Sequence, residues 1–177
     1  MRAIFAALFL LAAPLVPSLG AEPVKLAFVD TGNTGRSVTA EALARVLIAK
    51  DHLPVAVISR AVDFDPYETA PEENAMRLLA ARGLDVSAHR AQQLSANDVR
   101  HSDLILAMTA AHREKVIALF PEAREKIFTL AEYATGAPAD VEDAFGKPME
   151  NYRAMLRQVE SYLAPALAKA ARLKKAH

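Results

Sequence analysis

The alternation of short apolar runs with amphipathic segments most restricts the fold of this chain. Buried strands are predicted at Val24–Val29, Pro54–Ile58, Asp103–Met108 and Lys126–Leu130. Helices are predicted at 37–50, 71–82, 109–119 and 149–173, with a short one after Ser95. Strands that alternate with helices favour βαβ units, so we predict an α/β fold of three layers. Its central four-stranded parallel sheet is covered by helices on both faces.

Two segments are predicted to be loops, and one proline is expected to disturb a helix. The loops are residues 59–70 and the acidic, Gly/Pro-containing residues 131–148. Pro165 is expected to kink the last helix or to end it early, because a proline removes a backbone donor.

The first twenty residues are predicted to be a secretory signal peptide. Arg2 gives a positive start, the apolar run Ile4–Ala13 follows, and Ser18-Leu19-Gly20 offers small residues for cleavage. A membrane anchor is the alternative, but the run is shorter than the ~20 residues that span a bilayer. We therefore expect one domain over residues 21–177, exported (periplasmic in a Gram-negative source) and free of the membrane after cleavage.

Composition excludes several classes of function. The 177 residues include 21 basic and 21 acidic side chains, and this balance argues against a nucleic-acid partner, which would attract a basic excess. The chain has no cysteine, which excludes disulfides, thiolate metal ligands and a cysteine nucleophile.

The loop after the first predicted strand is the candidate binding site. It runs Asp30, Thr31, Gly32, Asn33, Thr34, Gly35, Arg36, Ser37. A glycine-containing loop before a helix turns backbone N–H groups toward one point and forms a cradle for an oxyanion. Gly32 and Gly35 allow positive φ and close approach, and Asn33 tolerates the left-handed conformation. The alternative is an ordinary turn in which Ser37 or Thr34 caps the helix.

Several motifs resemble the low-molecular-weight protein tyrosine phosphatase family, whose fold is shared by related arsenate reductases. Phe28 to Ser37, followed by Ala40-Glu41-Ala42-Leu43, resembles the family's phosphate loop. Three further segments match in family order: Gly83–Ala91, Asp103–Met108, and Asp143-Ala144-Phe145-Gly146 followed by Tyr152. The resemblance spans roughly residues 24–165 and implies the family's fold.

The resemblance implies a role for each matching residue of the loop. Arg36 and the loop N–H groups, from Thr31 to Ser37, would bind phosphoryl oxygens. Asn33 would hold the loop in shape, with His89 and Ser59 as supporting hydrogen-bond partners. Ser37 would help the leaving step.

The same resemblance places two residues of the 131–148 segment at the site. Asp143 would be the general acid that protonates the departing oxygen, and Phe145 would form one wall of the substrate slot. The expected ligand is a phosphorylated or otherwise anionic molecule, such as a phosphotyrosine protein.

This chain departs from the family pattern at the residue that defines the chemistry. Asp30 stands at the position of the nucleophilic cysteine, and Gly35 stands at that of the loop's second cysteine. Ala144 replaces the proline after the general acid, and Ser59-Arg60-Ala61 replaces the family's Ser-Ala-Gly. Arsenate reduction is excluded, because it needs thiols as electron donors.

Asp30 leaves two functions open. Its carboxylate could be a nucleophile, since carboxylates form aspartyl-phosphates in other folds. No cofactor or metal is expected unless Asp30 takes that role, in which case Asp30, Asp143 and Glu142 could supply oxygen ligands to Mg²⁺. Alternatively, the carboxylate fills the anion cradle and pairs with Arg36, and the protein is an inactive pseudophosphatase with a binding role. An aspartate would also escape the oxidation that disables a thiolate after export.

Overall fold

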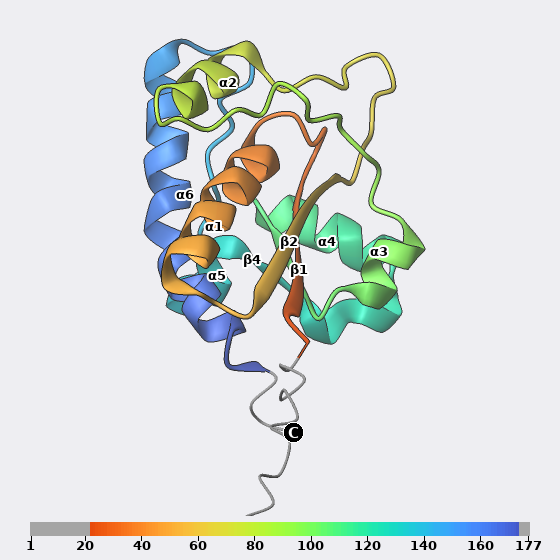
Figure 1. The fold of residues 1–177 in the computed structure, drawn as a ribbon. Coiled ribbons are helices and arrows are strands. Elements are labelled where there is room, and N and C mark those ends of the chain that lie inside the picture. The colour runs from red at the N-terminus through yellow and green to blue at the C-terminus, as the bar shows by residue number, and fades with distance from the viewer. Residues whose placement is uncertain (1–21, 174–177) are drawn as a thin grey trace, which may run out of the picture.

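The sheet has four parallel strands, and its order places β1 in the middle. The computed structural model describes residues 22–173. The strands are β1 (Val24–Asp30), β2 (Val55–Ala61), β3 (Leu104–Ala107) and β4 (Ile127–Thr129), in the order β2-β1-β3-β4. The predicted α/β fold with its four-stranded parallel sheet is confirmed (Figure 1).

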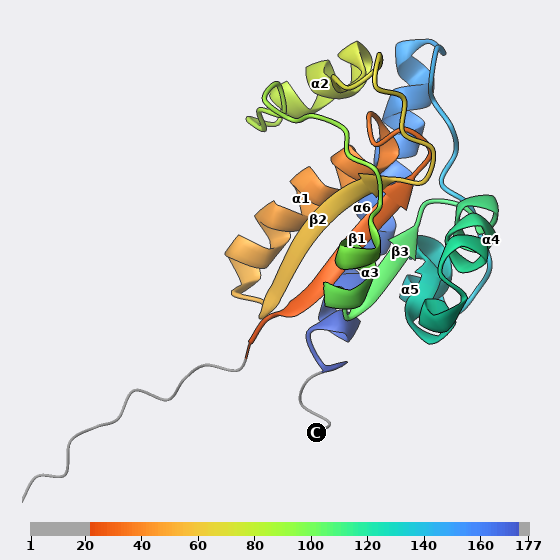
Figure 2. The same cartoon turned by 90° about the vertical axis from the view of Figure 1, so that its right-hand side faces the viewer.

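Helices cover both faces of this sheet. They are α1 (Arg36–Asp51), α2 (Glu73–Ala80), α3 (Ala96–His101), α4 (Ala110–Leu119), the 3₁₀ helix η1 (Pro121–Lys126), α5 (Leu130–Thr135) and α6 (Met149–Ala170). Residues of α1, α2, α5 and α6 share one core cluster with one face of the sheet, whereas α3, α4 and η1 pack on the other. Figure 2 shows α1 and α3 on opposite sides of the sheet.

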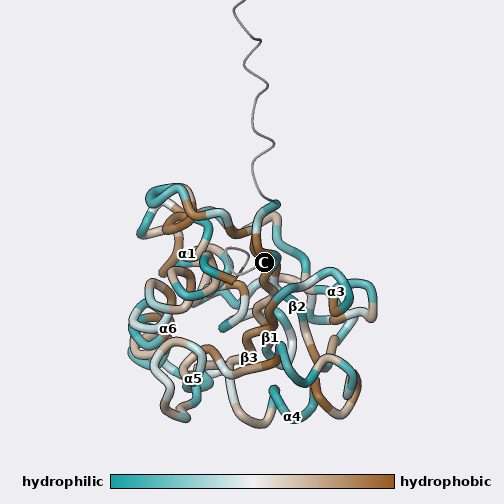
Figure 3. The backbone as a smooth tube through the Cα atoms, turned by 90° about the horizontal axis from the view of Figure 1, so that it is seen from below, coloured by the Kyte–Doolittle hydropathy of each residue, from teal (hydrophilic) through white to brown (hydrophobic). Residues whose placement is uncertain are grey.

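The strands are apolar on both sides because both sides are buried. Along β1, Leu26 and Phe28 belong to the core beneath α1 and α6, and Ala27 and Val29 belong to the core beneath α4. A strand enclosed in this way reads as a continuous apolar run rather than an alternating one. Figure 3 shows the hydrophobic strands between the two layers of helices.

The topology fixes where a ligand can bind. The chain leaves β1 for β2 on one side and later returns to β3 on the other, so the connections diverge beside the carboxyl end of β1. Ligands of open parallel sheets bind at such a point. Asp30 is the last residue of β1, which places the Asp30–Ser37 loop there.

The structure corrects the sequence-based prediction in three places. β2 continues through Ala61 rather than ending at Ile58. The first part of the predicted 131–148 loop is helical, because Thr129 and Glu132 form a capping box that starts α5. Helix α6 continues past Pro165 to Ala170, so the predicted early end is wrong.

The predicted signal peptide lies outside the described residues. Among residues 22–173, no helix is long and apolar enough to cross a membrane.

Helix α6 supplies a large part of the core. The contribution of its buried side chains to stability can be tested at Leu163. This side chain is 0% exposed, so Leu163→Ala should lower the free energy of unfolding by about 2–5 kcal/mol in chemical denaturation. The matched control is Leu119→Ala on α4, where the side chain is 50% exposed and the change should stay below about 1 kcal/mol. Equal losses for the two variants would contradict the packing of α6.

Candidate active site

The side chain of Asp30 lies at the centre of the loop and is bonded to it. Its Oδ1 accepts the N–H of Asn33 at 2.6 Å, and its Oδ2 accepts the N–H of Ser37 at 2.8 Å. Asp30 is 3% exposed. Because Ser37 stands in the first turn of α1, Asp30 satisfies a donor that the helix leaves unpaired and lies at the positive end of its dipole.

Asn33 shapes the loop through both its backbone and its side chain. It adopts φ 58°, and its Nδ2 donates to Ser37 Oγ at 3.0 Å. Its Oδ1 accepts the N–H of Gln92 at 3.1 Å, and its carbonyl accepts a hydrogen bond from His89 Nε2 at 2.9 Å. The shaping role expected for Asn33 and the support expected from His89 therefore have a geometric basis.

Three expectations about the loop need correction. Asn33 takes the left-handed conformation, whereas Gly32 and Gly35 have no positive φ. Residue 35 is the N-cap of α1, without a side-chain cap from Thr34 or Ser37. Ser59 does not support Asn33, because its hydroxyl points to α1 and donates to Glu41 Oε2 at 2.5 Å.

Arg36 and Asp143 meet above the loop. Arg36 Nη2 lies 3.2 Å from Asp143 Oδ2, and the Arg36 side chain is largely buried while that of Asp143 is half exposed. Two contacts bring the 140s segment here: Val141 donates to the carbonyl of Met108 at 2.9 Å, and Asp140 Oδ1 accepts the N–H of Ala110 at 2.7 Å. Asp140 therefore caps α4.

The predicted self-occupation of the cradle is present only in part. Asp30 takes two loop N–H groups, as that hypothesis requires. Among residues 22–173, however, Arg36 forms its ion pair with Asp143 and not with Asp30.

Glu72 is a site residue that the sequence reasoning missed. It is the N-cap of α2, and its N–H donates to the Thr34 carbonyl at 2.9 Å. Tyr152 donates its hydroxyl to Glu72 Oε2 at 2.5 Å. A Cβ at Gly35 would collide with Glu72 Oε1, so the absence of a side chain at residue 35 makes room for this carboxylate. Gly35 at the position of a family cysteine was the only signal in the sequence.

His112 is a second residue that was missed. Its Nε2 shares a hydrogen bond with Thr31 Oγ1 at 2.8 Å, and its ring is 8% exposed. Burial, and then the nearby Arg36, lower the pKa of His112. The neutral ring holds the second residue of the loop from the α4 side.

The loop opens into an acidic pocket of about 300 Å³. Phe145 lines one side of it, and its side chain is 59% exposed. The lining contains one guanidinium, of Arg36, and six carboxylates: Asp30, Asp63, Asp65, Glu68, Glu72 and Asp143. Lys115 pairs with Asp63 at 3.0 Å, which leaves the pocket acidic.

These carboxylates do not form a metal site. Within residues 22–173, no three histidine or acidic side chains gather closely enough to hold an ion. The Asp30, Asp143 and Glu142 set considered for Mg²⁺ is not gathered at this site, since Asp143 pairs with Arg36 and Glu142 does not line the pocket.

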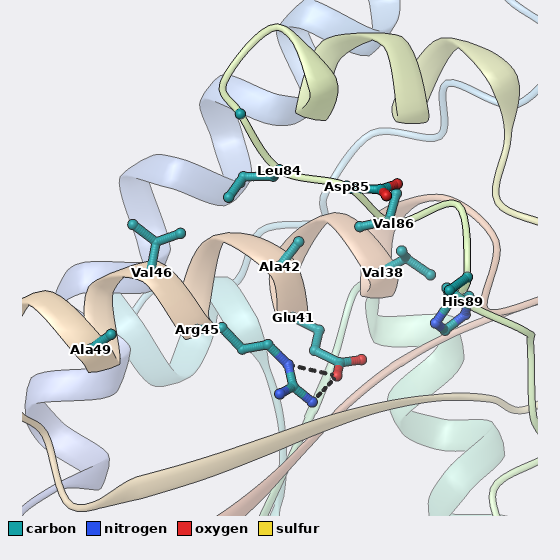
Figure 4. Close-up of a pocket in the computed structure, with 12 residues that line it drawn as sticks. Val38, Glu41, Ala42, Arg45, Val46, Ala49, Leu84, Asp85, Val86 and His89 are labelled. Atoms are coloured by element: carbon teal, nitrogen blue, oxygen red, sulfur yellow. Dashed lines mark hydrogen bonds and ion pairs between the residues drawn. The ribbon is translucent and has the colours of Figure 1, made fainter.

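A larger pocket of about 500 Å³ has His89 in its lining (Figure 4). It runs along α1 between Val38 and Ala49 and is closed by residues 83–89. Its charged side chains Glu41 and Arg45 are paired with each other at 2.7 Å. Asp30, Arg36 and Asp143 do not line it, so the chemistry belongs to the smaller pocket.

The sequence of this chain is similar to those of low molecular weight phosphatases. The sequence model of the low molecular weight phosphotyrosine protein phosphatases matches residues 25–177. A protein-arginine-phosphatase of Geobacillus stearothermophilus is 34% identical over 141 residues, which cover 80% of this chain and 92% of that protein. The low molecular weight protein-tyrosine-phosphatase PtpB of Staphylococcus epidermidis is 31% identical over 129 residues, which cover 73% and 86%.

One similar solved structure carries a phosphoryl group on a side-chain oxygen of its active site. It is a cysteine-to-serine mutant of the arginine phosphatase YwlE with a phosphorylated active-site serine. It superimposes with a TM-score of 0.78 at 33% identity, covering 86% of this chain and 97% of that one.

The role of Asn33 can be tested with two substitutions that separate its backbone from its side chain. Asn33→Gly keeps the left-handed backbone but loses the bonds to Ser37 and Gln92, and should lower the free energy of unfolding by about 1–3 kcal/mol. Asn33→Ala adds the strain of positive φ and should lower it by about 1 kcal/mol more. Chemical denaturation measures both, and wild-type stability of Asn33→Gly would contradict a role for the side chain.

Proposed function

Because the chain belongs to the low molecular weight phosphotyrosine protein phosphatase family, we propose that it binds a phosphorylated protein side chain at Asp30–Ser37 and transfers the phosphoryl group to Asp30. The observation that carries this proposal is the placement of the Asp30 carboxylate. It sits at the base of the pocket, held by the N–H groups of Asn33 and Ser37, with Arg36 and Asp143 above it. This arrangement supports assigning a nucleophile to Asp30, an anion-binding cation to Arg36 and an acid to Asp143.

The proposed reaction has two steps. A carboxylate oxygen of Asp30 forms a bond to phosphorus while the bond from phosphorus to the leaving atom breaks, and Asp143 gives its proton to that atom. Water then attacks the aspartyl-phosphate, Asp143 takes the proton from that water, and inorganic phosphate leaves as the Asp30 carboxylate is restored. Arg36 and the N-terminus of α1 offset the phosphoryl charge, with Arg36 exchanging Asp143 for phosphoryl oxygens.

Two observations support a phosphatase reaction with phosphoryl transfer to a side-chain oxygen. The relatives above carry phosphatase names. In the YwlE mutant, a serine at the active site is phosphorylated, so a phosphoryl group on a side-chain oxygen fits this fold.

Phosphoarginine is the side chain that suits the pocket best. Six carboxylates against one guanidinium disfavour an additional dianion unless the ligand carries positive charge of its own. A phosphorylated guanidinium group supplies that charge next to phosphorus, whereas a tyrosine ring does not. The protein-arginine-phosphatase name of one relative agrees with this choice.

The second candidate is a pseudophosphatase that binds a partner without turnover. The observation in its favour is that the Asp30 carboxylate already accepts two of the loop's N–H groups, which a phosphoryl oxygen would otherwise use.

Turnover by variants of Asp30 separates the two. We expect wild type to hydrolyse a phosphoarginine protein or an aryl phosphate, assayed with and without Mg²⁺. Asp30→Asn keeps the shape but is a poor nucleophile, and should lose at least about a hundredfold in kcat/KM. Acid-quenched wild type should carry one phosphoryl group on Asp30, released by hydroxylamine.

The control is Asp30→Cys, which restores the family's nucleophile. Wild type without turnover, combined with activity in Asp30→Cys, would overturn the catalytic role of Asp30 and establish the pseudophosphatase.

We also propose that the domain is exported by residues 1–20. The support is the charged start, apolar run and small residues of that segment. Expressed in a Gram-negative host, the full chain should appear in the periplasmic fraction with its N-terminus near residue 21, as measured by mass spectrometry. Full-length protein confined to the cytoplasm would contradict export.

A further inference from the structure

Glu72 is held against the phosphate loop from three directions. Its backbone N–H bonds the Thr34 carbonyl at 2.9 Å. One carboxylate oxygen, Oε2, accepts the short hydrogen bond of Tyr152 on α6. The other oxygen, Oε1, receives Thr34 Oγ1 at the long distance of 3.4 Å and lies over Gly35. The carboxylate is therefore fixed in position, while Oε1 keeps the capacity for a stronger donor.

The position of Glu72 puts this free capacity inside the pocket. Glu72 lines the pocket together with Asp30, Thr34 and Arg36. The space over residue 35 that a side chain there would occupy is taken by its carboxyl group. A ligand whose phosphoryl group lies in the loop presents the atoms nearest phosphorus to this part of the pocket.

We propose that Glu72 is a specificity-determining residue that selects ligands with a cationic N–H donor on the group bonded to phosphorus, as in a phosphorylated guanidinium, over phosphate esters of neutral phenols. This inference rests on the proposed binding of a phosphorylated side chain at the loop. A guanidinium donates to a carboxylate through charge-assisted hydrogen bonds, which are stronger than those between neutral groups. A phenyl ring offers Glu72 no donor and leaves its charge facing the phosphoryl group.

The surroundings of Glu72 shift the pKa of its carboxyl group. Burial raises the pKa of Glu72 above its ordinary value, the hydrogen bond from Tyr152 lowers it, Asp30 and Asp143 raise it, and Arg36 lowers it. Since the net change is upward, Glu72 loses its charge at a higher pH than an ordinary glutamate as the solution is acidified. Selectivity that depends on this charge must fall over the same range.

The test compares two peptides of one sequence by calorimetric titration of the full mature chain. One carries a non-hydrolysable phosphonate analogue of phosphoarginine and the other that of phosphotyrosine, and they are called here the phosphoarginine and phosphotyrosine peptides. Wild type should prefer the phosphoarginine peptide. Glu72→Gln, which keeps the size of the side chain and can still accept from Tyr152, should reduce the ratio of the two affinities by about tenfold. The matched control is Glu73→Gln, which removes the exposed carboxylate of the next residue on α2, outside the pocket, and should leave the ratio within about twofold.

Acidification supplies a readout that a purely structural role would not move. In wild type the affinity ratio should fall as the pH drops through the raised pKa of Glu72, and this step should be missing in Glu72→Gln.

The second variant is Gly35→Ala, whose methyl group displaces the carboxylate without removing its charge. It should also lower the affinity ratio, and it provides the result if Glu72→Gln proves unstable.

An unchanged ratio in both Glu72→Gln and Gly35→Ala, with either peptide still bound, would overturn the role of Glu72 and leave the proposed function intact. Failure of wild type to bind either peptide would overturn the proposed function, and this inference with it.

Discussion

The bond between the Asp30 carboxylate and the amino end of α1 organises this molecule. A parallel strand ends in the middle of the sheet, and the following helix begins with N–H groups that lack partners within it. A carboxylate at the strand end satisfies the N–H of Ser37 and, through Asn33, holds the turn between them. The same interaction that completes the strand–helix junction also places a carboxylate at the base of the pocket. A substitution of Asp30 therefore changes both the hydrogen bonds of the loop and the reactive group in the pocket.

The parts of the fold that sequence could predict are those set by local pattern. The apolar run from Val24 and the helical spacing after Ser37 are visible in a single chain, because burial on both faces and a period of 3.6 residues leave distinct signatures. The loop, with Asn33 and Arg36, was identified through its resemblance to the family's phosphate loop, since its own spacing also suited an ordinary turn. Helix α5 was missed because glycine and proline after Thr135 dominate that segment, although the Thr129 and Glu132 capping box was present.

The residues that sequence could not predict act across long separations. Glu72 reaches Tyr152 over 80 positions, and Thr31 meets His112 over 81. Neither contact has a local pattern, since each depends on how α2, α4 and α6 pack around the sheet. Ser59 was assigned to Asn33 by resemblance alone, and its partner is Glu41 because its hydroxyl points to α1. The partner of a strand side chain such as Ser59 is decided by packing, which spacing does not reveal.

The contact between Gly35 and Glu72 makes substitutions at the two positions interdependent. A side chain at residue 35 and a carboxylate at residue 72 compete for one volume, so the two positions are epistatic. A side chain introduced at residue 35 would have to displace the Glu72 carboxylate, so a substitution there also changes the wall of the pocket at residue 72.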